Sequence, residues 1–369
     1  MYSQNDLDEA VAAGAISADS AAALRTFVDS QRASPAVDEE NFRLITGFND
    51  IFVAIASAIL LFAVGWIGQS FGQSAGLILD VDGPSPIAPL FVAATAWALA
   101  LFFTAKRRMA LPSILLLLAF VGGVFATTIF SLVLGIGTDA FQDGSETLGG
   151  IVVAVSGAVA AAAAWLHWKR FRVPITVAAG AAGASVIAVG LLITALGRSP
   201  DEIENIILSL VLLLGIGVFL FAMRWDSSDP ARVTRRSDVA FWLHLLAAPM
   251  IVHPIFTLLG LNDGTATIGE GLIVIALYVA LGLTALAIDR RALLVSALAY
   301  VLYALIELFK QFGAVELNIA LAALVIGSAL LLLSAFWHQA RTLVVRQLPA
   351  ALQSKLPLLD RPASPVPAA

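Results

Sequence analysis

Cysteine is absent from the 369 residues of this sequence, and charged side chains are scarce. Without cysteine the chain can form no disulfide framework, no thiolate metal site and no cysteine nucleophile. Asp, Glu, Lys and Arg together make up 13% of the residues, against about 25% in soluble domains. An ordinary water-soluble domain is therefore excluded.

Signatures of enzymatic chemistry are also few. No HExxH pattern occurs, and the Gly-x-Gly fragments at Gly135 and Gly215 are not followed by the lysine of a phosphate-binding loop. The net charge of −5 gives no basis for nucleic-acid binding. We therefore expect a protein that is not an enzyme, with no catalytic residues, no metal site and no cofactor.

Apolar side chains dominate instead, at 60% of the residues and a mean hydropathy of +0.92. Ten apolar runs are long enough to cross a hydrocarbon core about 30 Å thick as helices, since lipid leaves no other way to satisfy backbone polar groups. We predict an all-α, polytopic membrane protein of ten transmembrane helices arranged as helical hairpins. The predicted spans are 48–69, 87–105, 111–135, 148–167, 174–196, 203–223, 239–260, 268–288, 292–310 and 315–337.

The positions of the basic residues predict the orientation. Threading the chain through ten spans places all but two of the 21 Lys and Arg residues on one side, the exceptions being Arg198 and Lys310. Loops on the other side are acidic and include Asp143 and Asp263. Because cytoplasmic loops are enriched in Lys and Arg, both termini are predicted to be cytoplasmic.

Composition divides the chain into three parts. Residues 1–43 form a short cytoplasmic helical hairpin and linker, in which one helix stops at Gly14 and Ser17 caps the next. Residues 44–338 form the ten-span membrane domain, and residues 339–369 form a cytoplasmic Pro-rich tail. Residues 1–35 carry few apolar side chains, so the membrane domain is expected to fold without them.

Two patterns concern helix packing. Basic turns recur at 106–108, 169–172 and 289–291, as expected for a series of hairpins closed on the cytoplasmic side. Small residues repeat at four-residue spacing in the fourth span, which predicts close approach to a neighbouring helix. They are Gly150, Ala154, Ala158 and Ala162.

Titratable side chains inside spans are candidates for function, because burying a charge at the bilayer centre costs at least about 2.5 to 3.5 kcal/mol. Glu307 shares one helical face with Tyr300 and Tyr303, and His244 and His253 lie in a span that also contains two prolines. His253 and Glu307 lie at similar depth, so they form a candidate proton-linked polar site.

Structural explanations compete with this site. Glu307 can extend to the outer interface and pair with Lys310, and a histidine can bond to a carbonyl that Pro249 or Pro254 leaves free. The two histidines are nine residues apart and face opposite sides of the helix, so they cannot share one metal ion.

The first seventy residues carry a resemblance to a known group. Leu7, Val11, Gly14, Ile16 and Ser17, followed by Ala22-Ala23-Leu24-Arg25 and Asn41-Phe42-Arg43-Leu44-Ile45, form the pattern. This sequence resembles the uncharacterised bacterial inner-membrane proteins of domain of unknown function 2157. The resemblance implies a multi-pass protein of the cell inner membrane, and it implies no activity.

Two functions are consistent with these features. The first is an inner-membrane protein in contact with the lipid bilayer that binds or transports a small solute near the seventh and ninth spans. The second is a membrane scaffold or sensor whose N-terminal segment contacts a cytoplasmic partner. The residues identify neither the solute nor the partner.

Overall fold

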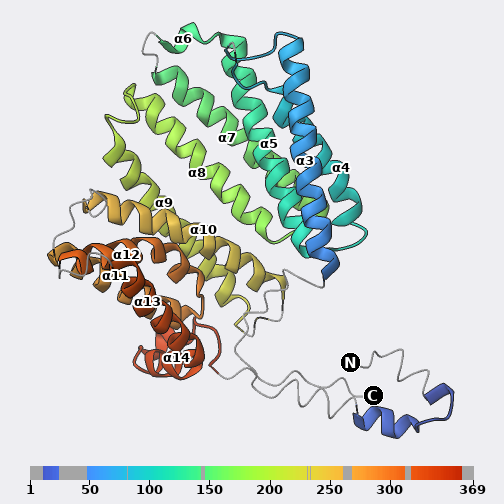
Figure 1. Cartoon of the computed structure of the whole chain (residues 1–369), viewed down its shortest axis with the longest axis vertical. Helices are drawn as coiled ribbons and strands as arrows, with labels where there is room; N and C mark the ends of the chain where they lie inside the picture. The colour runs from blue at the N-terminus through green and yellow to red at the C-terminus, as the bar shows by residue number, and fades with distance from the viewer. Residues whose placement is uncertain are drawn as a thin grey trace.

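The computed structural model describes residues 11–24, 48–80, 82–142, 146–230, 232, 234–260, 268–311 and 317–359. This part of the chain is built of helices and contains no strand, so the predicted all-α class is confirmed. Figure 1 labels most of the helices from α3 onward and shows them packed against one another. They are α3 Phe48–Ser74, α4 Ile87–Phe103, α5 Ala110–Ile136, α6 Asp139–Gln142, α7 Glu146–Phe171, α8 Ile175–Leu196, α9 Glu204–Ser227, α10 Arg235–Leu258, α11 Ile268–Ile288, α12 Ala292–Gln311, α13 Asn318–Ala335, α14 Trp337–Arg346 and α15 Ala350–Gln353.

Each of the ten predicted spans coincides with one of the helices α3 to α5 and α7 to α13. Within the described residues, eight helices are long and apolar enough to cross a membrane. They do not include α12, nor α4, which is apolar but only 17 residues long. The structure thus supports a multi-pass membrane protein, while the count of ten and the hairpin arrangement stay predictions.

Two details of the terminal parts bear on the predicted boundaries. Gly14 has the left-handed φ of 70° that ends a helix, and the Ser17 hydroxyl accepts a hydrogen bond from the backbone N–H of Ser20, so both predicted signals are confirmed. At the other end, the predicted start of the tail at residue 339 falls inside α14. The tail therefore begins as an ordered helix.

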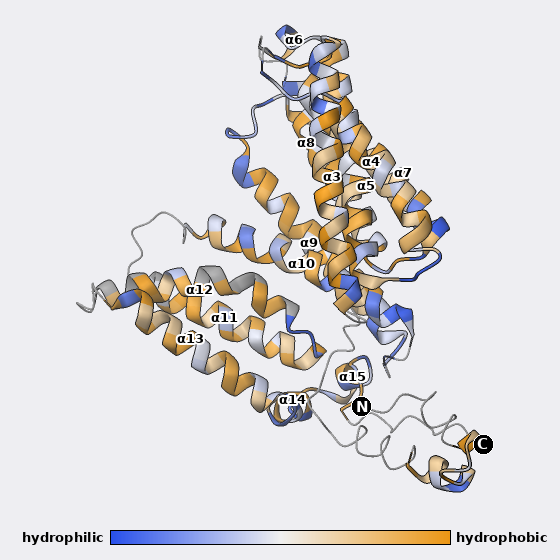
Figure 2. Cartoon of the chain, turned by 45° about the vertical axis from the view of Figure 1, so that its right-hand side comes forward, coloured by the Kyte–Doolittle hydropathy of each residue, from blue (hydrophilic) through white to orange (hydrophobic). Residues whose placement is uncertain are grey.

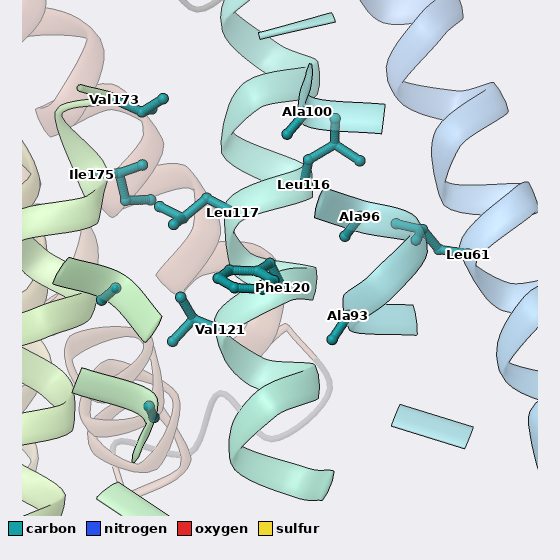
Figure 3. Packing of buried hydrophobic residues seen from close by; sticks show 12 residues of the cluster. Leu61, Ala93, Ala96, Ala100, Leu116, Leu117, Phe120, Val121, Val173 and Ile175 are labelled. Atoms are coloured by element: carbon teal, nitrogen blue, oxygen red, sulfur yellow. The ribbon is translucent and has the colours of Figure 1, made fainter. Parts of the chain in front are cut away.

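Helices α3 to α8 form the first group. Leu61 of α3, Ala96 of α4 and Phe120 of α5 pack in its core, where Leu117 meets Ile175 of α8 (Figure 3). Large apolar side chains also cover the outside of these helices, among them Phe62 and Trp66. Figure 2 shows hydrophobic residues along the helices and hydrophilic ones gathered at their ends, as expected for a lipid-facing surface.

Helices α7 and α8 approach most closely through glycine. A Cβ atom added at Gly190 would lie 2.5 Å from the backbone nitrogen of Ala154, and one added at Gly150 would lie 2.7 Å from the carbonyl oxygen of Gly190. The predicted stripe is correct at Gly150 and Ala154 but wrong at Ala158 and Ala162, which are exposed. Four-residue steps rotate about 40° per step around a helix of 3.6 residues per turn, so the contact moves to Gly157 and Ala161.

Helices α9 to α13 form the second group, whose last three members lie obliquely across α3 to α8 in Figures 1 and 2. Val252 and Phe256 of α10 pack against Val301 and Ala304 of α12. Helix α10 runs from Arg235 to Leu258 through both internal prolines. The two prolines therefore do not divide this span into two helices.

Candidate functional site: a buried ion-pair network beside an arginine-lined cavity

Four turns between consecutive helices meet at one end of the molecule, which we call the basic end. They link α4 to α5, α7 to α8, α9 to α10 and α11 to α12. Each contains one non-glycine residue in the left-handed region, with φ between 54° and 56°. These residues are Arg108, Arg172, Arg232 and Asp289.

Residues other than glycine are unusual in this left-handed conformation at the end of a helix. The backbone N–H of Arg290 bonds to the Ala285 carbonyl, five residues earlier, which is the six-to-one bond that normally closes a helix around a left-handed glycine. The backbone N–H of Met109 closes its turn one residue wider, on the Phe103 carbonyl. A side chain in this conformation costs about 1 to 2 kcal/mol. The chain bears this strain at four turns, three of them with arginine, which points to a use for the side chains.

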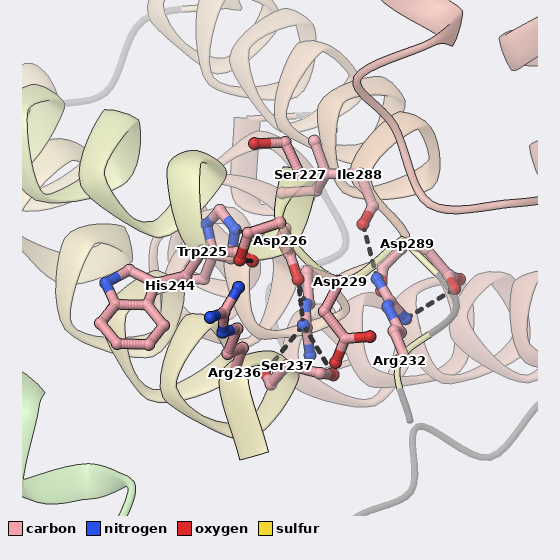
Figure 4. A network of polar contacts seen from close by, with 12 residues as sticks. Trp225, Asp226, Ser227, Asp229, Arg232, Arg236, Ser237, His244, Ile288 and Asp289 are labelled. Atoms are coloured by element: carbon pink, nitrogen blue, oxygen red, sulfur yellow. Dashed lines mark hydrogen bonds and ion pairs between the residues drawn. The ribbon is translucent and has the colours of Figure 1, made fainter. Parts of the chain in front are cut away.

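Asp226, in the last turn of α9, is the centre of a buried network at the basic end (Figure 4). Its carboxylate accepts two hydrogen bonds from the Arg290 guanidinium, at 2.5 and 3.2 Å, and lies 3.1 Å from Nε2 of His244. Arg290 also donates to the carbonyl of Ser237, at 3.0 Å. The side chains of Asp226 and Arg290 are buried, so these two charges can persist only because they are paired.

Asp289 organises a second set of contacts next to the first. Its carboxylate accepts hydrogen bonds from Arg232, at 2.7 Å, and from the indole N–H of Trp337, at 2.8 Å. Arg341 of α14 lies 3.7 Å from the same carboxylate and donates to the carbonyls of Pro357 and Leu358. These contacts tie the C-terminal segment to the turns of the basic end.

A cavity of about 460 Å³ opens beside this network. Its wall contains the N-terminal ends of three helices, at Met109 for α5, at Pro174 for α8 and at Arg235 for α10. Free backbone N–H groups and the helix dipole make such ends favourable for anions. Six arginines line the cavity, namely Arg108, Arg170, Arg172, Arg232, Arg235 and Arg290, together with one carboxylate, Asp238.

The arginines fall into two kinds. Arg232 and Arg290 are buried at the cavity wall and already bonded to Asp289 and Asp226. The other four are exposed, and no ion pair joins any of them to a carboxylate among the described residues. The cavity therefore presents an excess of positive charge that no carboxylate of the described residues pairs with.

This charge favours an anion over a bare metal cation in the cavity. Across the described residues, no group of three His, Asp or Glu side chains is arranged to hold a metal ion. The hydroxyl of Thr104, which also lines the cavity, is buried and has no hydrogen-bond partner. It is available to donate to a bound anion.

Of the residues singled out from the sequence, three have side chains that the structure describes. His244 belongs to the Asp226 network, His253 is exposed on the surface of α10, and Tyr303 is half-buried on α12. The side chains of Glu307 and Tyr300 lie outside the part of the chain that the structure describes. The pairing of His253 with Glu307 therefore stays a prediction.

One further motif can be assessed from the structure. Gly72, Ser74 and Gly76 have the G-x-S-x-G spacing of a hydrolase nucleophile, which needs a strand before the serine. Here the motif closes the C-terminal end of α3, and the Ser74 hydroxyl donates to the carbonyl of Ser70. The spacing therefore gives no support to a hydrolase site.

Sequence reasoning missed Asp226 and Arg290 as partners. The available signal was the sign of the charge: Asp226 and Asp289 are carboxylates on the side of the chain where nearly all Lys and Arg residues gather. Acidic residues in such turns are candidates for buried pairing. Which arginine each one meets depends on contacts across more than fifty residues of sequence.

Comparison with protein-family models, with curated proteins and with solved structures finds no match. The resemblance of the N-terminal segment to domain of unknown function 2157 therefore stays a prediction.

Proposed function

We propose that this protein is an integral membrane protein of the cell inner membrane that binds a small anionic solute in the arginine-lined cavity, without catalysing a reaction. In this proposal the chain crosses the membrane ten times, both termini are cytoplasmic and the basic end faces the cytoplasm. The observation that carries the proposal is the convergence of six arginines and three helix N-termini on one cavity.

Three features support binding over a purely structural role. A structural cluster would balance its charges, yet four exposed arginines of the cavity have no carboxylate partner among the described residues. Arg108 and Arg172 bear backbone strain that glycine would relieve. The volume also lies in the range of about 300 to 1,000 Å³ found for small-molecule sites.

The paired arginines explain how the site stays positive without unfolding the bundle. Asp226 and Asp289 neutralise the two buried guanidiniums, so only groups at the water-accessible rim stay unpaired. An exposed charge has a small desolvation penalty, and it is attracted to a solute anion on approach. The buried network thus serves as the scaffold, and the exposed arginines of the cavity serve as the binding surface.

Topology is tested with single cysteines, because the natural chain has none to remove. Ser228→Cys between α9 and α10 and Ser354→Cys after α15 are expected to be shielded from a membrane-impermeant thiol reagent in intact cells. Thr138→Cys before α6 and Thr265→Cys between α10 and α11 are expected to react. Labelling of Ser228→Cys together with protection of Thr138→Cys would contradict the proposed orientation.

Binding is tested by titrating the purified full-length protein with inorganic pyrophosphate in a calorimeter. Each turn offers a matched pair of basic residues, one in the cavity wall and one outside it. The cavity variant is Arg108→Gln with Arg172→Gln and Arg235→Gln. The control variant, with the same change of charge, is Arg107→Gln with Lys169→Gln and Arg236→Gln, all three exposed in the wild type.

The cavity variant is expected to bind pyrophosphate roughly 10- to 150-fold more weakly, because each exposed charge pair contributes about 0.5 to 1 kcal/mol. The control variant is expected to stay within about threefold of the wild type, because its changes act only through screened, long-range charge. Equal losses in both variants would mean that pyrophosphate follows overall surface charge. Failure of the wild type to bind would refute the proposed site.

A further inference from the structure

The composition of the cavity wall carries more information than its charge. Every cation in the wall is an arginine, although Lys106 and Lys169 lie in the same turns and point elsewhere. The planar guanidinium offers two parallel N–H donors that match the oxygens of a phosphate or carboxylate, whereas the ammonium group of lysine acts as a point charge. The wall is therefore built for bidentate recognition of an oxyanion.

The amount of charge distinguishes between oxyanions. Arg108, Arg170, Arg172 and Arg235 have no carboxylate partner among the described residues, and Asp238 is the one acidic residue in the wall. A carboxylate group brings a single negative charge, whereas a phosphate monoester carries about −1.5 to −2 at neutral pH and three acceptor oxygens. The phosphate matches the excess of donors more closely.

Size and polarity imply that the phosphate is attached to something else. A cavity of about 460 Å³ is much larger than one inorganic anion requires. Apolar side chains complete the wall, among them Met109, Val173, Phe241 and Trp242. Aromatic and aliphatic groups in an otherwise basic cavity provide contact area for an organic body.

We infer that the cavity binds a phosphate ester whose organic part is apolar, with the phosphate on the unpaired arginines and the Thr104 hydroxyl and the organic part against Phe241 and Trp242. This inference rests on the proposed function and specifies its ligand class. Two sources share this chemistry: a soluble organic phosphate, and the headgroup region of an anionic phospholipid. The second is within reach because basic pockets at the cytoplasmic ends of transmembrane helices recruit such headgroups.

Phenyl phosphate is the probe for this chemistry, with inorganic phosphate and benzoate as the two partial probes. Calorimetric titration of the full-length protein in phosphatidylcholine nanodiscs is expected to show at least tenfold tighter binding of phenyl phosphate than of either. Phe241→Ala is expected to weaken phenyl phosphate binding about fivefold and to leave pyrophosphate binding unchanged. Phe221→Ala, at an exposed aromatic position of α9, is the control.

Repeating the titration in nanodiscs that contain phosphatidylglycerol decides whether the phosphate belongs to a soluble organic phosphate or to a phospholipid. If the lipid occupies the cavity, phenyl phosphate affinity falls at least tenfold and native mass spectrometry finds the lipid retained by the wild type but lost from the triple cavity variant. If a soluble phosphate is the ligand, the affinity is the same in both membranes. Either result supports the inferred ligand class.

The results that would overturn the inferred ligand class differ from those that would refute the proposed anion site. Equal affinities for phenyl phosphate, inorganic phosphate and pyrophosphate would overturn the inference, while anion binding as such would stand. Tighter binding of benzoate than of phenyl phosphate would overturn the choice of phosphate. Absence of binding for every probe would refute the proposed function together with the inference.

Discussion

Replacing Asp226 with asparagine removes one charge from the centre of the buried network and keeps the size of the side chain. Asparagine has nearly the same shape as aspartate, and its side-chain oxygen can still accept a hydrogen bond from Nε2 of His244, now 3.1 Å away. What the variant loses is the negative charge that faces Arg290 and one of the two oxygens that accept from its guanidinium, because the amide NH2 that replaces this oxygen is a donor. The change therefore tests the contribution of the charged, hydrogen-bonded Asp226–Arg290 pair at nearly constant side-chain volume.

The expected loss of unfolding free energy follows from the burial of the Asp226 and Arg290 side chains. The side chain of Asp226 is 0% exposed and that of Arg290 is 3% exposed, so Asp226→Asn leaves a buried guanidinium without its counter-charge. Breaking such a pair on one side costs about 3 to 5 kcal/mol. Arg290 also borders the cavity and keeps its bond to the Ser237 carbonyl, so the lower end of this range applies. We expect a loss of about 3 kcal/mol of unfolding free energy.

The assay is reversible unfolding of the purified protein in mixed micelles of increasing SDS content, followed by tryptophan fluorescence. Asp201→Asn is the matched control, because it makes the same chemical change at an exposed position outside the network. It is expected to stay within about 0.5 kcal/mol of the wild type. The double variant Asp226→Leu with Arg290→Met removes both charges and is expected to be more stable than Asp226→Asn.

The outcome that refutes this reasoning is a loss below about 1 kcal/mol for Asp226→Asn. It would mean that Arg290 is already hydrated in the wild type and that the pair contributes like a surface salt bridge. A double variant less stable than Asp226→Asn would also contradict this reasoning, because removing both charges leaves no buried charge without a partner.

Three further changes have defined outcomes. Gly190→Ala is expected to destabilise the protein by about 1 to 3 kcal/mol, because its Cβ would meet the backbone of Ala154. Gly122→Ala is the control and is expected to stabilise the protein by up to about 1 kcal/mol, because a Cβ at Gly122 would meet open space. The same micelle titration measures both changes. Arg172→Gly is expected to raise the free energy of unfolding by up to about 1 kcal/mol, because glycine relieves the left-handed backbone strain, and to weaken pyrophosphate binding. A gain of stability with unchanged pyrophosphate affinity would contradict a role of Arg172 in the site. Deleting residues 1–35 is expected to leave membrane insertion intact, as measured by alkaline extraction of membranes, and loss of insertion would count against a separable N-terminal segment.

Helix positions were predictable because their causes are local. An apolar run surrounded by lipid must satisfy its own backbone, and the run from Ile175 to Leu196 ends where Gly197 provides the left-handed residue that closes it. The cap at Ser17 and the stop at Gly14 are local signals of the same kind. Each depends on residues within one or two helical turns.

Helix faces were predictable only in part. The four-residue stripe identified Gly150 and Ala154 correctly and failed at Ala158 and Ala162. Small residues occur on several faces of α7, and the neighbouring helix selects one of them. That choice depends on the direction in which α8 crosses, which no residue of α7 specifies by itself.

The candidate site was the part of the structure least predictable from the sequence. Basic turns and the absence of soluble-protein composition are properties of the sequence, and they indicated a membrane protein with one positively charged side. Asp226 meets Arg290 across 64 residues of sequence, and the cavity combines Arg108, Arg172 and Arg235 from three separate turns. Hydropathy and charge act along the chain and determine which segments are helices and which side of the membrane the basic turns prefer. Only tertiary packing decides which charges neutralise one another and which remain to face a ligand, because Coulombic pairing depends on distances that sequence separation does not determine.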